Sequence, residues 1–134
     1  MVLGVDPGTR KAGYAIADST GRALELGIEP VETLLERLRQ LAGTHSIIAV
    51  ALGRGTNALP VRDQIRSLGL PVHLIDESET TLQARGLYFA DHPPRGWRRL
   101  IPLGLQLPPR PIDDYAALLI ARRFIERGAS APAS

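Results

Sequence analysis

Apolar residues near the start of the chain come in short runs that predict three consecutive strands. Val2–Asp6 is almost wholly apolar and ends at Pro7-Gly8, which is typical of a buried strand followed by a turn. A second apolar run covers Gly13–Ala17 and closes at Asp18–Gly21, so the two strands are expected to form a hairpin. Arg22–Ile28 alternates weakly between apolar and polar residues, which predicts a third strand.

The pattern changes to helical spacing after Pro30. Apolar residues then recur every three or four positions, at Val31, Leu34, Leu35, Leu38 and Leu41. Proline at the start and Gly43 after the last apolar residue are typical helix boundaries. The next run, Ser46–Leu52, is short and nearly all apolar, as expected of a central strand that is covered on both faces.

The rest of the chain alternates between helices and one more strand. Leu59–Leu68 has helical spacing and stops at Gly69, and Pro71–Ile75 reads as a strand. Glu79–Ala90 and Ile112–Arg127 are predicted as the last two helices. The predicted order is β-β-β-α-β-α-β-α-α, which indicates an α/β protein.

Two stretches fall outside this regular pattern. Residues 91–111 contain too many prolines and glycines for regular structure, and a loop this long in a compact domain is usually functional or mobile. Residues 129–134, ASAPAS, are predicted to form a disordered tail. Because the chain has 134 residues, no internal repeat and no dividing linker, we expect one domain over residues 1–128.

Composition narrows the class of protein. Hydrophobic residues make up 44% of the chain and charged residues 22%, which is ordinary for a globular domain. No apolar run approaches the roughly 18 residues that cross a bilayer, and no signal-peptide pattern opens the chain, so we expect a cytoplasmic protein that does not contact the membrane. The chain has no cysteine, which leaves oxygen atoms as the main ligands for a metal.

Basic charge is concentrated in one stretch, although the net charge is only +2. Residues 85–110 carry five arginines against one acid, Asp91, with Trp97 among them. The arginines are Arg85, Arg95, Arg98, Arg99 and Arg110. Arginines beside an aromatic ring can hold phosphates and stack a base, which indicates nucleic acid as a partner. The alternative is a solvated loop in a protein that prefers arginine to lysine.

Five carboxylates stand where the edge of a sheet would collect them. Asp6 ends the first strand, Asp76 and Glu77 follow the last strand, and Asp113 and Asp114 begin the last helix. The carboxyl ends of neighbouring strands meet at one edge, the usual place for a site in an α/β fold. Converging carboxylates repel one another unless a cation neutralises them, and Mg²⁺ or Mn²⁺ suits oxygen ligands. Such ions activate water for phosphodiester cleavage.

Each of these acids also has a purely structural explanation. Asp6 can be a turn residue before Pro-Gly, and Asp76 can cap the helix that follows it. Asp113 and Asp114 can complement the positive end of the helix dipole. Both flank the apolar face of their helix equally, so periodicity does not choose between them.

Taken together, four segments resemble the YqgF/RuvX family, relatives of the RuvC Holliday-junction resolvase within the RNase H-like superfamily. They are GVDPGTRKAGYA, VALGRGTN, LIDESETTLQARGLYFA and PIDDYAALLIARRFIERG, and they extend over nearly the whole chain. The resemblance implies an RNase H-like α/β fold. Its sheet has five strands in the order 3-2-1-4-5, with strand 2 antiparallel and helices on both faces.

The resemblance also implies three catalytic acids. The family's acid in the first strand matches Asp6, its Glu beyond the last strand matches Glu77, and the acid that opens its last helix matches Asp113. This match favours Asp113 over Asp114, which stays the alternative ligand. The family pattern implies two Mg²⁺ or Mn²⁺ ions, with Asp6 bridging both and the other two acids each holding one.

Two departures separate this chain from the usual family pattern. Ser78 stands where members usually have Arg after the Asp-Glu pair, and Gly53-Arg54-Gly55 replaces Gly-Leu-Pro. Loss of that Arg weakens a phosphate contact unless Arg54 or Arg85 replaces it. RuvC carries its Glu at the end of the fourth strand, where this chain has Leu52-Gly53-Arg54, and this difference indicates the YqgF branch.

The implied activity is that of a metal-dependent nuclease, with nucleic acid as its partner. The family is associated with 5′ maturation of pre-16S rRNA and with resolution of Holliday junctions, and these residues do not distinguish RNA from DNA. The basic residues expected to contact the nucleic acid are Arg10, Lys11, Arg54, Arg85, Arg95, Arg98 and Arg99. A homodimer is expected if the substrate is a symmetric junction, whereas a monomer favours RNA.

Two other classes of protein share parts of this pattern. The segment from Asp6 to Thr9 resembles the phosphate loop of sugar kinases and actin-like ATPases, but those proteins need a second, duplicated domain for which 134 residues leave no room. An RNase H-like domain can also serve as a non-catalytic module that binds nucleic acid. The presence of Asp6, Glu77 and Asp113 argues against that alternative.

Overall fold

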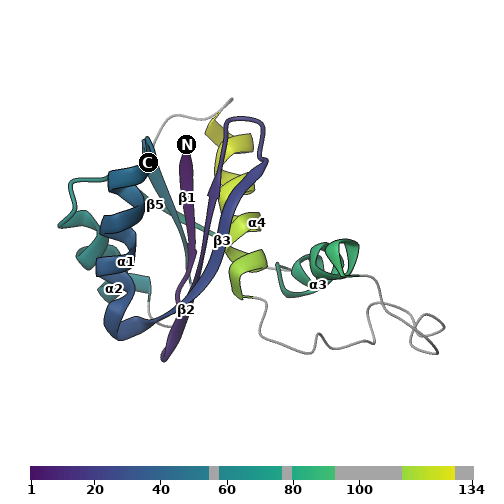
Figure 1. The fold of residues 1–134 in the computed structure, drawn as a ribbon, viewed down its shortest axis with the longest axis horizontal. Coiled ribbons are helices and arrows are strands. Elements are labelled where there is room, and N and C mark those ends of the chain that lie inside the picture. The colour runs from purple at the N-terminus through teal and green to yellow at the C-terminus, as the bar shows by residue number, and fades with distance from the viewer. Residues whose placement is uncertain (55–57, 77–79, 93–112, 129–134) are drawn as a thin grey trace.

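One mixed sheet of five strands organises the protein, in the order β3-β2-β1-β4-β5 (Figure 1). The computed structural model describes residues 1–54, 58–76, 80–92 and 113–128. The strands are β1 (Val2–Asp6), β2 (Lys11–Ala17), β3 (Ala23–Pro30), β4 (Ala49–Gly53) and β5 (Val72–Ile75). β2 pairs antiparallel with both β1 and β3, whereas β4 pairs parallel with β1 and β5. The strand order and the reversed second strand are therefore confirmed.

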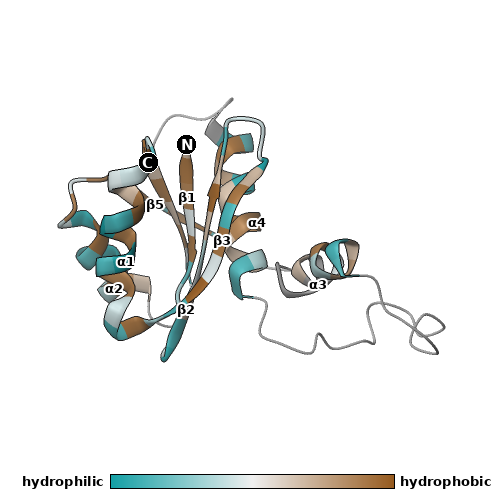
Figure 2. Ribbon diagram, in the orientation of Figure 1, coloured by the Kyte–Doolittle hydropathy of each residue, from teal (hydrophilic) through white to brown (hydrophobic). Residues whose placement is uncertain are grey.

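Helices cover both faces of this sheet. α1 (Val31–Thr44) and α2 (Ala58–Arg66) lie on one face, and α4 (Asp113–Gly128) lies on the other (Figure 1). α3 (Thr80–Asp91) packs against α4. The strands between the helices are largely hydrophobic, and the exposed sides of the helices are largely hydrophilic (Figure 2). The prediction of an α/β fold with helices on both faces is confirmed.

The end of α1 differs slightly from its prediction. Gly43 does not stop the helix, which runs on to Thr44 and ends where His45 adopts an extended backbone. The His45 N–H donates to the Leu41 carbonyl at 2.9 Å, and the Thr44 hydroxyl lies 3.3 Å from the Gln40 carbonyl. These bonds satisfy carbonyls of the last turn without a left-handed glycine. Gly43 is thus a helical residue, and space is open around it.

The start of β4 also differs from its prediction. The strand begins at Ala49 rather than Ser46, because the preceding residues bond to the chain terminus instead of to a strand. The Met1 ammonium donates to the Ser46 carbonyl at 3.0 Å, and the Ile48 N–H donates to the Met1 carbonyl at 2.9 Å. The apolar run therefore includes a short connection before the strand.

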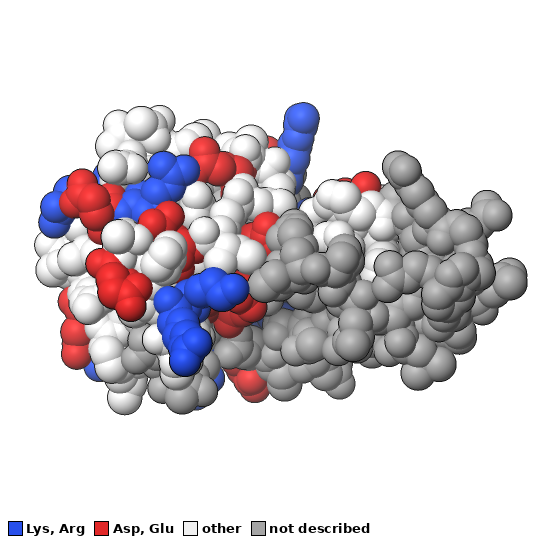
Figure 3. Space-filling view, turned by 60° about the horizontal axis from the view of Figure 1, so that its bottom comes forward, with Lys and Arg blue, Asp and Glu red and all other residues white. Residues whose placement is uncertain are grey.

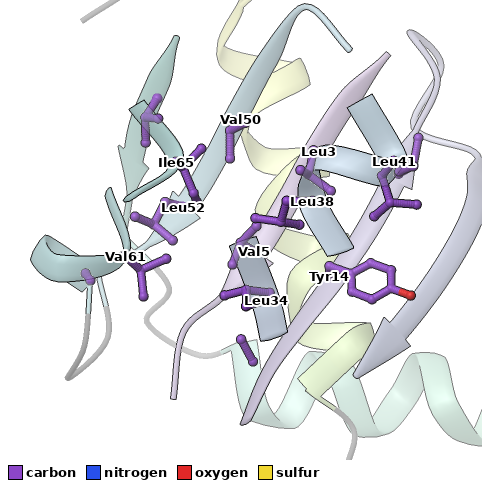
Figure 4. Close-up of a cluster of buried hydrophobic side chains, with 14 residues drawn as sticks. Leu3, Val5, Tyr14, Leu34, Leu38, Leu41, Val50, Leu52, Val61 and Ile65 are labelled. Carbon is purple, nitrogen blue, oxygen red and sulfur yellow. The ribbon is translucent and has the colours of Figure 1, made fainter. Parts of the chain in front are cut away.

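The larger hydrophobic core lies between the sheet and α1 with α2. Leu34, Leu38 and Leu41 point from α1 toward strand residues such as Leu3 and Val5 (Figure 4). Six of the leucines and isoleucines in this core are less than 2% exposed: Leu3, Ile16, Leu34, Leu38, Leu52 and Ile65. Burial of each such side chain is worth about 1.5–3 kcal/mol of transfer free energy, so this face anchors the sheet.

The opposite core is built mainly from small side chains under α4. Ala15, Ala17 and Ala51 of the sheet face Ala117 and Ala121 of the helix, and all are buried. Small residues on both sides allow the helix backbone to approach the strands closely. This close approach decides where the first turn of α4 lies.

An aromatic cluster joins α3 to α4. The rings of Tyr88 and Tyr115 meet edge to face with centroids 5.8 Å apart, and Phe89 adds a second edge contact to Tyr88. The Tyr115 hydroxyl donates to the Asp91 carboxylate at 3.0 Å. These contacts hold α3 beside the first turns of α4.

Some predictions concern residues that the structure does not describe. The predicted tail at 129–134 and most of the long loop, residues 93–112, lie outside the described residues. The proposed extent of the domain therefore stays a prediction. Among the helices that the structure describes, none is long and apolar enough to cross a membrane.

Candidate active site

Three of the predicted acids, Asp6, Asp76 and Asp113, lie at the edge of the sheet where β1, β4 and β5 end. β1 ends at Asp6, and Asp76 directly follows β5. β1, β4 and β5 run parallel to one another, so their carboxyl ends lie along the same edge. α4 begins at Asp113, and its first residue meets this edge at β2.

Strand alternation places the Asp6 side chain on the α4 side of the sheet. Val2 belongs to the core under α4, whereas Leu3 and Val5 belong to the core under α1 and α2. Successive side chains of a strand point to opposite faces, so Gly4 and Asp6 share the face of Val2. Asp6 is half-buried there.

A glycine brings Asp113 over the same part of the sheet. Gly13 of β2 is the direct partner of Asp6 in the antiparallel pair, and partners of this kind lie roughly 4.5–5.5 Å apart between Cα atoms. A Cβ atom on Gly13 would lie only 2.0 Å from the Asp113 carbonyl oxygen. The start of α4 therefore rests on the strand partner of Asp6.

Lys11 is a basic residue whose charge acts on Asp113. It lies two residues before Gly13 on β2, hence on the same face, and it is exposed. Partial burial raises the pKa of Asp113 above its ordinary value, the charge of Lys11 lowers it, and Asp114 raises it; the net shift is upward. A half-buried carboxylate beside a lysine is suited to exchange that partner for a metal cation.

The structure distinguishes Asp113 from Asp114, as sequence periodicity could not. Asp114 is only 6% exposed, and its carboxylate accepts the Tyr115 N–H at 3.0 Å. Asp113 is half-buried and lies over the partner of Asp6. The Asp113 side chain is therefore the more accessible of the two, whereas the Asp114 carboxylate bonds within the first turn of α4.

An arginine from α4 holds the backbone that leads to Glu77. The Arg123 guanidinium donates to the Asp76 carbonyl at 2.6 Å, across 47 positions of sequence. Asp76 itself is exposed. Glu77, the predicted third acid, lies outside the described residues, but its neighbour Asp76 is tied to the same helix that carries Asp113.

Three of the predicted nucleic-acid contacts lie near this edge with exposed side chains. Arg10 and Lys11 stand at the start of β2, and Arg54 follows β4. Their backbones are fixed: the Arg10 carbonyl accepts the Val31 N–H at 2.9 Å, and the Arg54 N–H donates to the Ile75 carbonyl at 3.1 Å. Seen from the lower side of Figure 1, basic side chains lie beside acidic ones (Figure 3).

The other predicted contacts are not tested by the structure. The side chain of Arg85 is outside the described part of the molecule, as are Arg95, Arg98 and Arg99. They stay predictions.

Two residues that matter here were not singled out by the sequence. Gly13 and Arg123 position the acids without belonging to the predicted acid or basic set. A glycine inside a strand often marks the close approach of another backbone, so the place of Gly13 in a predicted strand could have indicated this contact. Nothing in the sequence distinguishes Arg123 from its neighbour Arg122.

The donor set fits a hard divalent cation. Asp6 and Asp113 supply carboxylate oxygens from β1 and α4, and the chain contains no cysteine. Among the residues that the structure describes, no three acids or histidines form a metal-binding group. A complete site therefore requires a further ligand, and Glu77 stands next in sequence to Asp76 at the same edge.

Comparison with known proteins decides the family. No family model matches the chain. It is 37% identical to the crossover junction endodeoxyribonuclease RuvC of Chlorobaculum parvum over 158 aligned residues, which cover 97% of this chain and 83% of that protein. It is 30% identical to a protein of Pelotomaculum thermopropionicum and 31% identical to one of Azotobacter vinelandii, with 93% of this chain covered in each case. Both are named, provisionally, as pre-16S rRNA nucleases.

This chain belongs to the YqgF/RuvX family. As a YqgF/RuvX protein it is a nuclease of the RNase H-like superfamily, and the resemblance noted in its sequence is confirmed. The match extends over 83–92% of the length of these relatives. The comparison establishes the family, but the names of these relatives indicate two different substrates, crossover junctions in DNA and pre-16S rRNA.

Solved structures agree with the fold of this YqgF/RuvX protein. RuvC of Thermus thermophilus superposes with a TM-score of 0.54 at 19% identity and covers 99% of both chains. The structure of T. thermophilus RuvC in complex with a Holliday junction substrate superposes with a TM-score of 0.52 at 20% identity. At this level of identity the likeness establishes the common fold alone.

Proposed function

We propose that this protein hydrolyses phosphodiester bonds of nucleic acid with two Mg²⁺ or Mn²⁺ ions held by Asp6, Glu77 and Asp113. The observation that carries the proposal is the contact of the Asp113 backbone with Gly13, the strand partner of Asp6. Membership of a nuclease family supplies the reaction class.

The order of strands suggests a role for each acid. β1 is the central strand, so Asp6 lies between Asp113, which rests over β2, and the end of β5, which leads to Glu77. The acid in the middle is the natural bridge between two ions, and each outer acid holds one. Ions bound there would activate a water molecule and stabilise the attacking and leaving oxygens of the phosphodiester.

Basic residues around the acids are proposed to hold the substrate backbone. Lys11 and Arg10 lie at one side of Asp6, and Arg54 follows the neighbouring strand β4. Phosphate contacts from such residues position a nucleic acid without reading its sequence, and they weaken as salt rises. Arg98 and Arg99 in the arginine-rich segment are proposed to extend this contact.

RNA is the substrate that we favour, as structured RNA or the 5′ end of pre-16S rRNA. The proposed Glu ligand follows β5, and β4 ends at Gly53-Arg54 without an acid, which is the YqgF arrangement described above. The alternative is resolution of a Holliday junction, which the name of the Chlorobaculum parvum relative supports. Junction resolution needs two sites on a symmetric dimer, whereas RNA cleavage works with one.

A cleavage assay tests the proposal. Purified protein is incubated with single-stranded RNA, duplex DNA and a four-way junction, with Mn²⁺, Mg²⁺ or EDTA. We expect cleavage that requires the metal and falls at least about 100-fold in Asp6→Asn, Glu77→Gln and Asp113→Asn, since loss of a ligand costs at least as much as loss of its supporting residue. Asp63→Asn, which changes an exposed carboxylate on α2, is the matched control and is expected to cleave normally.

Other outcomes of this assay would redirect the proposal. Cleavage that survives EDTA or all three substitutions would refute the metal mechanism. Tight, metal-independent binding without any cleavage would support a non-catalytic binding module. Preferential cleavage of the junction by a protein that has the mass of a dimer in solution would favour the resolvase alternative.

The double substitution Arg98→Ala with Arg99→Ala is expected to weaken nucleic-acid binding and to flatten the salt dependence of that binding.

A further inference from the structure

We propose that Gly13 is a positioning residue of the active site, because its missing side chain sets the height of α4 above β2. That height sets the spacing between the carboxylates of Asp6 and Asp113. The inference rests on the proposed function, in which these two acids bind metal. It assigns a role in metal binding to a residue that offers no ligand atom.

The contact at Gly13 leaves no room for any side chain. A Cβ atom there would lie 2.0 Å from the Asp113 carbonyl oxygen, 2.1 Å from its carbonyl carbon and 2.6 Å from the Asp114 nitrogen. All three atoms are backbone, so no rotamer change relieves the clash. Because nonbonded contacts to a Cβ essentially never fall below 3.0 Å, alanine at position 13 requires the start of α4 to rise by about 1 Å or more.

A second glycine makes the same kind of contact farther along the helix. A Cβ atom on Gly4 of β1 would lie 2.1 Å from the Ala117 carbonyl oxygen and 2.9 Å from the Ala121 Cβ. α4 therefore rests on β2 at its first residue and on β1 about one turn later. These two contacts fix both the height and the tilt of the helix, and only the contact at Gly13 lies under a proposed ligand.

A shift of this size matters for a metal site. Oxygen ligands bind Mg²⁺ and Mn²⁺ within narrow distances, near 2.0–2.1 Å for Mg²⁺, and a functional constellation tolerates errors of only about 0.5 Å. Asp6 is carried by β1 and Asp113 by α4, so movement of the helix changes their separation directly. Gly13 thus controls metal affinity through geometry, apart from any effect on stability.

Metal binding without nucleic acid separates these two effects. The Mn²⁺ dissociation constant is measured by titration calorimetry for the wild type, Gly13→Ala and the control Gly27→Ala, at a temperature where circular dichroism shows each to be folded. At Gly27 an added Cβ would lie 2.3 Å from the Tyr14 ring, on the sheet face away from α4. Both substitutions introduce crowding, but only one lies under Asp113.

We expect Gly13→Ala to raise the Mn²⁺ dissociation constant at least about tenfold, and to lower cleavage by about 100-fold, as misplacement of reacting groups by 1 Å does. Gly27→Ala should keep the wild-type dissociation constant within about twofold, even where it lowers the melting temperature. If Gly13→Ala does not fold, Gly4→Ala replaces it, because a rigid helix raised at Ala117 also carries Asp113 away from Asp6.

Failure of the proposed role of Gly13 can be distinguished from failure of the proposed function. If the wild type binds Mn²⁺ and Asp6→Asn abolishes binding, while Gly13→Ala binds Mn²⁺ as tightly as the wild type, the role of Gly13 is refuted and the proposed function stands. Equal weakening by Gly13→Ala and Gly27→Ala would also overturn the inference, because it would indicate a general loss of packing. If the wild type neither binds Mn²⁺ nor cleaves any substrate, the proposed function fails.

Discussion

Substitution of the two adjacent aspartates on α4 should produce opposite phenotypes. In Asp113→Asn a proposed metal ligand is lost, so we expect cleavage to fall at least about 100-fold and Mn²⁺ affinity to fall with it. In Asp114→Asn a buried carboxylate that accepts the Tyr115 N–H is replaced by an amide, and we expect cleavage within about threefold of the wild type at low temperature. Function and stability therefore separate between neighbouring residues.

The magnitude of the stability loss follows from burial. Asp114 is 6% exposed; asparagine keeps an acceptor oxygen for the Tyr115 N–H but places an amide NH2 in the buried site, and a buried donor left without a partner costs about 1–3 kcal/mol. For a domain of this size that corresponds to a fall in melting temperature of about 3–12 °C. Asp113 is half-buried, and burial raises its pKa, so its ionised form is already disfavoured in the fold. Asp113→Asn should thus raise the melting temperature of the metal-free protein at pH 7.

Two measurements on the same preparations check this prediction. Differential scanning calorimetry in EDTA gives the melting temperatures, and cleavage at 20 °C with Mn²⁺ gives kcat/KM. Loss of cleavage in Asp114→Asn with retention in Asp113→Asn would refute the assignment of the ligand on α4. A lower melting temperature for Asp113→Asn in EDTA would refute the argument that its charge is disfavoured by burial.

Three further predictions concern pH, backbone conformation and the core. Because the pKa of Asp113 is raised above 3.8, its ionisation costs stability at higher pH; the melting temperature of metal-free Asp113→Asn should exceed that of the wild type at pH 7, and scans at decreasing pH should show the gap narrowing as pH falls towards 3.8 and absent below it. Urea unfolding should show Gly43→Ala to be more stable than the wild type by about 0.5–1 kcal/mol, because Gly43 is helical. Gly69→Ala should be less stable by about 1–2 kcal/mol, because Gly69 has φ +81°. The reverse order would contradict the assigned end of α1. Leu38→Ala should destabilise the protein by about 2–5 kcal/mol in the same assay, because this side chain of α1 is fully buried against the sheet. The Mn²⁺ dissociation constant of the folded protein should stay unchanged, because Leu38 lies on the face of the sheet away from α4.

Most of the architecture could be predicted from the sequence because its signals are local. The apolar runs at Val2–Asp6 and Gly13–Ala17 became β1 and the core of β2, and the helical spacing after Pro30 became α1. Predicted boundaries were less accurate where backbone and side-chain hydrogen bonds at the end of a helix take the place of the usual glycine cap. Gly43 failed to end α1, since backbone bonds at Thr44 and His45 close the last turn without it.

Part of the candidate site was also predictable, with the help of the family resemblance. Asp6 and Asp113 were chosen from the sequence, and the structure places the end of β1 and the start of α4 at one edge of the sheet; their role as ligands stays a prediction. Glu77 and the arginines Arg95, Arg98 and Arg99 were chosen in the same way and stay predictions, because they lie outside the described residues. Their geometry depends on segments that no local pattern specifies.

The sequence by itself determined the kind of chemistry, because the types of ligand, the order of elements and the family segments are properties of the chain. Only the tertiary structure revealed that Asp114 is buried whereas Asp113 is half-buried, since that difference depends on which face of α4 meets the sheet. It also revealed that Gly13 and Arg123 hold α4 and the end of β5 in place. Such contacts join residues far apart in the chain, and their strength comes from close packing of backbones that sequence spacing does not record.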